Sequence, residues 1–311
     1  IPTFRTWLGG DELGQMFTKM YVDLGKDGRI AKRSPTSGEI DALFPIERDT
    51  LAVLLAGQVS QAAVGQGLCG WLGRGDVAVC WMSDQEMRLA SALQGLGVER
   101  IVIRSPLSSD CEAVHQTDRF LETVRSLVSV EGHHDRLRLP DEVLKDAKAR
   151  LDAGGGYGER PFVAVHPGSG SRHKCSAASL LAYAIERLQS AGAVPILVVG
   201  PADGERLAEV SEACAVPPPV FQNLPLLSVA GLLAHANLFL GHDSGLMHLA
   251  AALQIPIIAL FGPTERRRWA PRGSHVTVLS GAPCLCRGQG WQAVQLCRDK
   301  PCLQVPPEAL V

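Results

Sequence analysis

Two short polar segments in the second half of the sequence have residue types and spacings suited to binding an anionic ligand. The first, residues 166–174, reads HPGSGSRHK. Glycines such as Gly170 let the backbone approach an anion closely, Ser169 and Ser171 can donate hydroxyl hydrogen bonds, and Lys174 supplies a positive charge. Because the pattern is neither a Walker motif nor GxGxxG, a phosphate-binding loop and an ordinary solvated turn are both open interpretations.

The second segment, residues 241–248, reads GHDSGLMH. Asp243 or Ser244 is a good N-cap for a helix that begins at this point. A Ser244–Gly245 pair with free N–H groups, followed one turn later by His248, is also typical of a pyrophosphate cradle. The simpler alternative is a capping residue followed by a histidine that is buried in the core.

Both polar segments directly follow apolar runs that are typical of buried strands. The pattern after residue 158 predicts alternating strands and helices, with strands over 162–166, 194–199, 237–240 and 256–261 and helices over 177–191, 205–213, 229–235 and 246–253. Such alternation predicts a parallel sheet with right-handed crossovers. Ligands of parallel sheets bind beyond the carboxyl ends of the strands, so we expect the two polar segments to lie at one edge of the sheet.

The first half of the sequence shows the same alternation more weakly. Its predicted strands are 76–81 and 100–104, and its predicted helices are 85–96, 112–128 and 143–151. The glycine-rich segment DAGGGYG at 152–158 then predicts a linker. We therefore expect an α/β protein with two Rossmann-like domains, residues 1–152 and 159–311.

Length and composition agree with two globular domains and exclude several classes of protein. The chain has 311 residues, of which 46% are hydrophobic and 20% charged, so it can form a large core and is not disordered. Its net charge of −2 gives no basic bias towards nucleic acid. The N-terminal sequence lacks the pattern of a signal peptide, and no apolar run predicts a transmembrane helix. We expect a cytoplasmic protein whose nine cysteines are mostly reduced.

Four of these cysteines lie close together in the sequence, at Cys284, Cys286, Cys297 and Cys302. Ten residues separate Cys286 from Cys297 and four separate Cys297 from Cys302, which departs from the paired CxxC spacing of zinc sites. A metal site, a disulfide and free thiols are all compatible with this pattern. We favour a disulfide or free thiols, and we assign no metal.

Residues 241–271, GHDSGLMHLAAALQIPIIALFGPTERRRWAP, resemble the signature of glycosyltransferase family 9, the ADP-heptose:lipopolysaccharide heptosyltransferases. That signature has D-[ST]-G-x-x-H-x-A-A-A, then FGPT, then W-x-P. The segment VAVHPGSGSRHK is similar to the phosphate loop of the family, with Lys174 at its basic position and Cys175 where an aromatic residue is usual. HQTDRFL at 115–121 is similar to a further family helix, and many members carry late cysteines.

The resemblance implies a GT-B arrangement, in which two Rossmann-like domains with parallel sheets face each other across a cleft. It implies inverting transfer of a sugar, with heptose as the expected one, from an ADP-sugar to a lipopolysaccharide core acceptor, without a metal or another cofactor. The acceptor domain would be residues 1–152 and the donor domain residues 159–311. Because the acceptor is linked to lipid, we expect peripheral contact with the inner face of the inner membrane. The implied donor-binding residues are Ser169, Gly170, Ser171, Lys174, Glu205, Leu227, Asp243, Ser244, Gly245, Leu246 and His248.

The resemblance also implies a catalytic carboxylate near the N-terminus that acts as a general base, with Lys174 as the second catalytic residue. In the family, a Gly-Asp pair after the first strand supplies the general base, and Gly10–Asp11 is the matching pair here. Asp11 would take the proton of the acceptor hydroxyl, whereas the alternative is that it only caps a helix. Two other functions stay open, namely a family member with another nucleotide-sugar and acceptor, and a nucleotide-sugar binding protein without catalysis.

Overall fold

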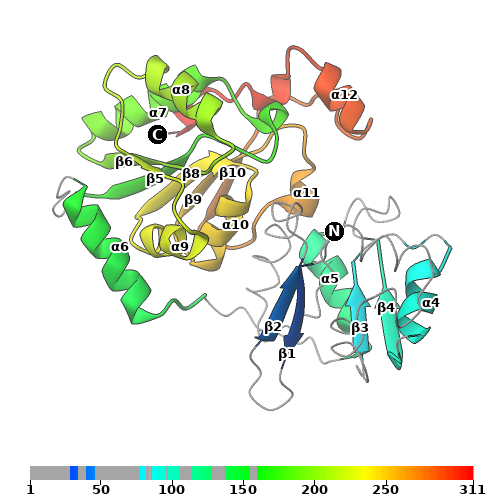
Figure 1. Ribbon diagram of the computed structural model, residues 1–311. Helices are drawn as coiled ribbons and strands as arrows, with labels where there is room; N and C mark the ends of the chain where they lie inside the picture. Colours follow the sequence, from blue (N-terminus) through cyan, green and yellow to red (C-terminus); the bar gives the residue numbers. More distant parts are fainter. Residues whose placement is uncertain are drawn as a thin grey trace. The chain divides into compact units, whose positions relative to one another are not determined.

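The chain divides into two compact units, residues 1–134 and 135–311, and each is described by itself (Figure 1). The computed structural model describes residues 29–33, 40–45, 77–81, 84, 86–95, 97–105, 114–127, 137–154 and 160–310. Asp11 therefore lies outside the described residues. In the described part of the chain, no helix is both long enough and apolar enough to cross a membrane.

The first unit contains two small sheets. Strands β1 (Arg29–Arg33) and β2 (Ile40–Pro45) form an antiparallel pair that the sequence analysis does not predict. Strands β3 (Val77–Cys80) and β4 (Arg100–Ile103) pair in parallel and are joined through helix α4 (Arg88–Gly95), as predicted. The apolar face of α4 packs on this pair, with Cys80, Leu89, Ala92, Leu93 and Val98 in the core. Helix α5 (Gln116–Val124) follows.

The second unit is built on one six-stranded sheet in the order β10-β9-β8-β5-β6-β7, and every neighbouring pair in it is parallel. Its strands are β5 (Phe162–His166), β6 (Val194–Val199), β7 (Val220–Gln222), β8 (Leu238–His242), β9 (Ile257–Leu260) and β10 (Val276–Leu279). All residues of β5 and β6 are buried, because helices cover both faces of a parallel sheet of this kind.

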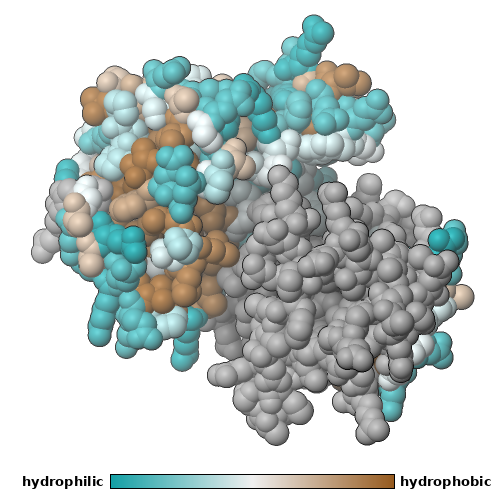
Figure 2. All heavy atoms as spheres, in the orientation of Figure 1, coloured by the Kyte–Doolittle hydropathy of each residue, from teal (hydrophilic) through white to brown (hydrophobic). Residues whose placement is uncertain are grey.

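The helices of the second unit lie on the two faces of this sheet, with α7 and α8 on one face and α9 and α10 on the other (Figure 1). Their bounds are α7 (Ala178–Ser190), α8 (Gly204–Ala213), α9 (Leu226–Ala234) and α10 (Gly245–Ala252). Leu181 and Ile185 of α7 are fully buried against Val165 and Leu197 of the sheet. In Figure 2, apolar surface of the second unit gathers over the face that carries α9 and α10.

Helix α6 (Asp141–Ala153) belongs to the second unit, because its buried Ala147 and Leu151 lie on the side that packs against α9. A Cβ added to Gly231 of α9 would lie 2.9 Å from the Cβ of Ala147, so the two helices approach closely. Leu137 N also donates a 2.9 Å hydrogen bond to the carbonyl of Ala252. The sequence analysis instead places this helix in the first domain and the boundary after it, at the glycine-rich segment.

The segment after β9 contains only short elements. They are α11 (Arg266–Trp269), α12 (Trp291–Leu296) and the 3₁₀ turns η3 (Pro301–Leu303) and η4 (Pro307–Leu310), while η2 (Arg172–Lys174) lies earlier, in the loop after β5. The C-terminal turn packs back onto the core through Val305 and Leu310, both of which are buried beside α7. The sheet and this returning segment together surround the loops that follow β5, β8 and β9.

Candidate functional site

The two polar segments meet where the strand order of the second unit reverses. From β5 the chain adds β6 and β7 on one side of the sheet and then β8, β9 and β10 on the other. Strands β5 and β8 are therefore neighbours, and His166 pairs with Gly241 at their carboxyl ends. In open α/β sheets this reversal leaves a crevice between the two loops, and ligands bind there. The sequence expectation that both segments lie at one sheet edge is thus confirmed.

Direct contacts hold the two segments together. The Ser169 hydroxyl donates a 2.6 Å hydrogen bond to the Asp243 carbonyl. Lys174 Nζ lies 3.0 Å from Asp243 Oδ2, and the side chains of these two residues are 16% and 1% exposed. Lys174 is thus held at the surface of the crevice by a buried carboxylate. Part of the Lys174 side chain stays exposed to solvent.

The second segment opens helix α10 as the sequence predicts. Ser244 is the N-cap, and its hydroxyl accepts a hydrogen bond from Met247 N at 3.4 Å. Gly245 and Leu246 are partly exposed in the first turn, while His248 is buried. The first backbone N–H groups of a helix lack partners within the helix and carry partial positive charge. This helix end is therefore suited to an anion that lies beside Lys174.

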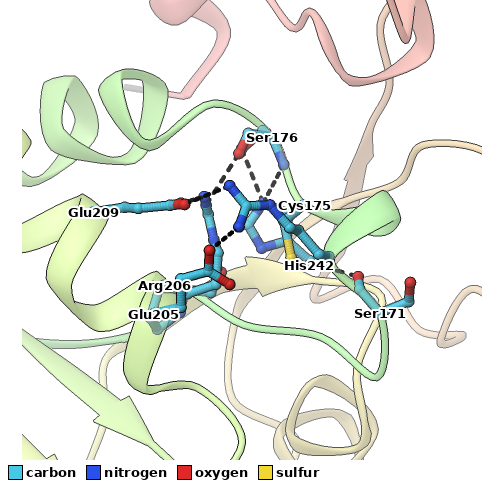
Figure 3. Close-up of polar contacts among 9 residues, drawn as sticks. Ser171, Cys175, Ser176, Glu205, Arg206, Glu209 and His242 are labelled. Carbon is cyan, nitrogen blue, oxygen red and sulfur yellow. Dashed lines mark hydrogen bonds and ion pairs between the residues drawn. The ribbon is translucent and has the colours of Figure 1, made fainter. Parts of the chain in front are cut away.

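A layer of polar contacts under the first segment fixes both ends of its loop (Figure 3). Arg206 of α8 is 9% exposed, and it donates to the Ser176 carbonyl at 3.0 Å and to the Pro167 carbonyl at 3.3 Å. The backbone N of Ser176 donates a 3.0 Å hydrogen bond to His242 Nε2. The Ser176 hydroxyl lies 2.9 Å from the same nitrogen. Arg206 and His242 thus connect the two segments from beneath.

His242 is fully buried, and this burial lowers its pKa to about 3, with Arg206 and His166 nearby adding to the effect. The imidazole is therefore neutral at physiological pH. Its Nε2 atom accepts the hydrogen bond from Ser176 N and cannot carry a proton at the same time. A neutral acceptor at this point fits the layer, because a charged one would repel the neighbouring guanidinium.

Gly168 lies directly over the Asp203 side chain. A Cβ at this position would lie 1.9 Å from Asp203 Oδ1, so only glycine fits. Asp203 is buried, and its Oδ2 accepts a 2.7 Å hydrogen bond from Gly200 N, which fixes the turn between β6 and α8. The glycine of the first segment therefore allows the loop after β5 to pack against the loop after β6.

Other predicted site residues lie further from the Lys174–Asp243 contact. Glu205 is exposed and forms an ion pair with Arg172, which also lies 2.6 Å from Glu209. Leu227 is 55% exposed near the start of α9. Ser171 caps the 3₁₀ turn η2 and accepts from His173 N at 3.3 Å, and Gly170 is exposed beside it. These residues belong to the loops and helix starts at the carboxyl ends of the strands.

A hollow of about 320 Å³ lies at the start of α7. Its lining includes Arg172, Arg206 and Lys300, but neither Lys174 nor Asp243. Glu209 pairs with both arginines and Glu205 also pairs with Arg172, so two carboxylates balance the two guanidinium groups. We therefore place the candidate site at the crevice between β5 and β8.

The sequence analysis misses Arg206 and His242 as parts of this site. An arginine in a helix is expected at the surface, and Arg206 is buried because two carbonyls and the Glu209 carboxylate accept its hydrogen bonds. His242 gave a weak signal, because it directly precedes the Asp-Ser-Gly sequence. In the first unit, His115 caps α5 by accepting from Thr117 N at 3.3 Å, and Arg119 is buried in the same helix.

The late cysteines form a second candidate site. The sulfurs of Cys284, Cys286 and Cys297 all lie within 4.8 Å of one another. These residues and Cys302 are free thiols in the described part of the chain. Of the alternatives that the spacing leaves open, the disulfide is not formed here. The spacing did not point to a metal, yet the folded chain brings the thiols together.

Residues 106–289 match the family model for glycosyltransferase family 9 (heptosyltransferase). Over 142 residues the chain is 31% identical to lipopolysaccharide heptosyltransferase 3 of Escherichia coli, covering 44% of this chain and 41% of that protein. Over 163 residues it is 25% identical to lipooligosaccharide heptosyltransferase 2 of Campylobacter jejuni, covering 50% of this chain and 49% of that protein. The chain thus spans about half the length of the curated relatives it matches.

Solved structures share the fold. A glycosyl transferase family 9 protein from Veillonella parvula superposes with a TM-score of 0.66 at 18% identity, covering 78% of this chain and 74% of that one. Escherichia coli ADP-heptose lps heptosyltransferase II superposes with a TM-score of 0.61 at 17% identity, covering 100% of this chain and 98% of that one. Together with the parallel sheet and its alternating helices, these matches confirm the prediction of a two-domain α/β fold of the GT-B class.

Proposed function

The chain belongs to glycosyltransferase family 9, the heptosyltransferase family, and from this premise we propose that it transfers a heptose from an ADP-sugar to a lipopolysaccharide core acceptor. The relatives it matches are named as lipopolysaccharide and lipooligosaccharide heptosyltransferases, which supports this choice of sugar and acceptor. The acceptor is linked to lipid, so the protein would act in the cytoplasm, at the inner face of the inner membrane, through peripheral contact.

The observation that carries the proposal is the meeting of the two polar segments at the strand reversal. Contacts with Asp243 bring Lys174 and the Ser169 loop together with the start of helix α10. A nucleoside diphosphate needs such a combination of a cation, helix N–H groups and hydroxyl donors. Asp243 holds the lysine in place, and buried His248 supports the first turn of the helix from within.

We propose a single displacement that inverts the anomeric carbon. The acceptor oxygen attacks that carbon as the bond to the ADP oxygen breaks, and Asp11 takes the proton of the acceptor hydroxyl. Negative charge grows on the departing diphosphate. Lys174 and the N–H groups of Ser244, Gly245 and Leu246 would stabilise this charge, so the step needs no divalent metal at the donor site.

We propose two further donor contacts. Leu227 is exposed near the start of α9 and would offer apolar surface to the adenine ring. Glu205 would accept hydrogen bonds from the ribose hydroxyls after exchanging its ion pair with Arg172. Because that pair is exposed to solvent, breaking it requires little free energy. Ser171 and Gly170 would complete the phosphate loop.

A direct test measures ADP release from a panel of ADP-sugars, with and without a lipopolysaccharide core acceptor. We expect release from ADP-heptose that depends on the acceptor and is unchanged by a chelator of magnesium and manganese. In parallel, calorimetry measures the binding of ADP. Binding without release would favour a nucleotide-sugar binding protein, and release from a different ADP-sugar would favour another activity within the family.

The variant Asp11→Asn tests the proposed base. A general base contributes roughly 10²–10⁴-fold to rate, so turnover is expected to fall at least about 100-fold while ADP binding is kept. The neighbouring Glu12→Gln variant is the matched control, because it removes a carboxylate one residue away. Near-normal turnover in Asp11→Asn would remove Asp11 from the mechanism.

A further inference from the structure

Four cysteines converge in the loop-rich segment that follows β10. Cys284 Sγ lies 2.9 Å from Cys286 Sγ and 3.5 Å from Cys297 Sγ. Cys302 is fully buried, and its thiol is near enough to that of Cys284 for the two groups to interact electrostatically. The four residues come from the loop before α12, the C-cap of α12 and the turn η3. Three separate pieces of backbone therefore direct their thiols at one point.

This arrangement suits a metal ion better than a disulfide. A disulfide joins two sulfurs, whereas the Cys284 sulfur lies close to the sulfurs of both Cys286 and Cys297. In a tetrahedral site with Zn–S bonds of about 2.3 Å, the sulfurs lie about 3.8 Å apart. The described sulfurs of Cys284, Cys286 and Cys297 all fall within 4.8 Å of one another, which requires only small adjustments around an ion.

Arg287 lies beside the cluster and is suited to balance its charge. Its Nη2 atom donates a 2.9 Å hydrogen bond to the Gly262 carbonyl. Its Nε atom is buried, and none of the described residues accepts a hydrogen bond from it. Four thiolates around a divalent ion carry a net charge of −2, so a neighbouring guanidinium with a spare N–H group is a favourable outer partner.

The segment has little apolar burial to hold it in place. Leu285 is 95% exposed, Leu296 is 73% exposed and Trp291 is 44% exposed. Helix α12 has only six residues, far below the length at which an isolated helix is stable in water. The fold of this segment would therefore gain from a cross-link, and metal binding supplies one in many small loop-rich segments.

We propose that Cys284, Cys286, Cys297 and Cys302 bind a single thiophilic metal ion, of which Zn²⁺ is the one to test, as a structural site. Three of these sulfurs already lie within mutual reach and buried Cys302 lies beside Cys284, and sulfur ligands select zinc or iron over magnesium and calcium. With all four positions taken by protein ligands, no position is open for substrate, and the ion takes no part in the transfer reaction.

The site would position the segment against the donor loops. Besides the Arg287–Gly262 contact, Lys300 Nζ lies 2.8 Å from His173 Nδ1, and the ring of Trp291 packs edge-on against His173 at 6.4 Å. His173 belongs to the 166–174 segment, and Gly262 follows β9. The metal would therefore brace two of the loops that surround the candidate site.

The first test is elemental analysis of the full chain purified without added metal. We expect about one zinc or one iron per chain, falling to near zero in Cys302→Ser and Cys284→Ser. Cys214→Ser is the matched control, because Cys214 is a buried thiol at the end of α8 and should leave the metal content unchanged. Equal metal content in all three variants would overturn the proposal.

A second measurement uses the unsubstituted chain, so it holds even if a variant does not fold. Metal-bound thiols react slowly with alkylating reagents, and we expect four thiols to become reactive once a strong chelator removes the ion. Replacement of the ion by Co²⁺ should also produce the visible absorption bands of a tetrahedral thiolate complex. A preparation without metal, or a disulfide within this cluster found by mass spectrometry, would overturn the assignment.

Discussion

At the scale of single residues, Lys174 is paired with buried Asp243, the residue directly before the N-cap of α10. Lys174→Ala should lower turnover with ADP-heptose by about ten-fold or more, because losing a hydrogen bond to a charged group costs roughly 1.5–3 kcal/mol. The measurement is kcat at saturating donor and acceptor.

The matched control for this change is Lys148→Ala on α6, whose exposed lysine pairs only with Asp152 on the same helix. Thermal unfolding of both variants separates a loss of folding from a loss of catalysis, since Lys174→Ala also removes the ion pair with Asp243. Unchanged kcat in a folded Lys174→Ala protein would show that the lysine does not contact the donor phosphates.

We expect the folding stability of the second unit to depend on pH through His242. Its pKa is about 3 in the folded state and near 6.5 when unfolded, so between these values only the unfolded chain binds the proton. Stability is therefore lost as pH falls through this window, by at most about 1.4 kcal/mol per pH unit. The thermal midpoint should drop more between about pH 7 and pH 4.5 in the unsubstituted chain than in His242→Gln.

Glutamine is the appropriate replacement, because its carbonyl oxygen can still accept the hydrogen bond from Ser176 N without gaining a proton. The comparison concerns the slope against pH and not the midpoint itself, so a general destabilisation by the substitution does not affect it. Equal slopes in the two proteins would mean that His242 is not the residue that titrates.

At the scale of elements, the close packing of the loops after β5 and β6 makes Gly168 irreplaceable. The new Cβ of Gly168→Ala would meet Asp203 Oδ1 at 1.9 Å and force that carboxylate away from Gly200 N. We expect ADP binding to weaken by at least about ten-fold, because Lys174 lies on the same loop. Calorimetric titration with ADP measures the effect.

Gly204→Ala is the control for this substitution. Gly204 is the first residue of α8, next to Asp203, and nothing lies within 4 Å of a Cβ added there. Alanine also favours a helix over glycine, so this variant should bind ADP normally and be slightly more stable. Normal ADP binding by Gly168→Ala would show that the turn tolerates a displaced Asp203.

The elements that sequence patterns predict well are those with a continuous apolar signal. The bounds of β5 and β6 agree with the prediction to the residue, because each is a fully buried run that ends at a polar or glycine loop. Strands β7 and β10 were missed, since they have three and four residues and lie at the edges of the sheet. An edge strand lacks one neighbour, so fewer of its residues are buried and the pattern weakens.

The candidate site was also predicted only in part from the sequence. The motif residues Ser169, Lys174, Asp243 and Ser244 were identified from sequence, and the structure brings them together. The supporting contacts were not identified, because an arginine such as Arg206 becomes buried only when distant carbonyls accept its hydrogen bonds. Tertiary partners of this kind leave no periodic signal in the chain.

At the scale of the whole molecule, the position of α6 determines which fragment of the chain should fold alone. A fragment of residues 135–311 keeps α6 on α9, including the 2.9 Å hydrogen-bond contact between His235 Nε2 and the Leu144 carbonyl. We expect it to unfold cooperatively and to bind ADP. Both measurements use calorimetry on the purified fragment.

A fragment of residues 159–311 tests the alternative boundary at the glycine-rich segment. It lacks α6 and exposes the face of α9 around Gly231, which Ala147 covers in the intact chain. Losing the burial of Leu151 alone removes roughly 1.5–3 kcal/mol of hydrophobic stabilisation, so this fragment should melt at a lower temperature. Equal melting temperatures would place the boundary after α6.

The two hydrogen bonds that Arg206 donates to the ends of the loop after β5 have a consequence for protein engineering. A loop whose ends are fixed by backbone carbonyls can change its intervening side chains without losing its anchors, since carbonyl groups are common to every residue type. Libraries that randomise residues 169–173 while keeping Arg206, Pro167 and Ser176 should therefore give many folded members. Such libraries offer a route to selecting enzymes with altered donor preference.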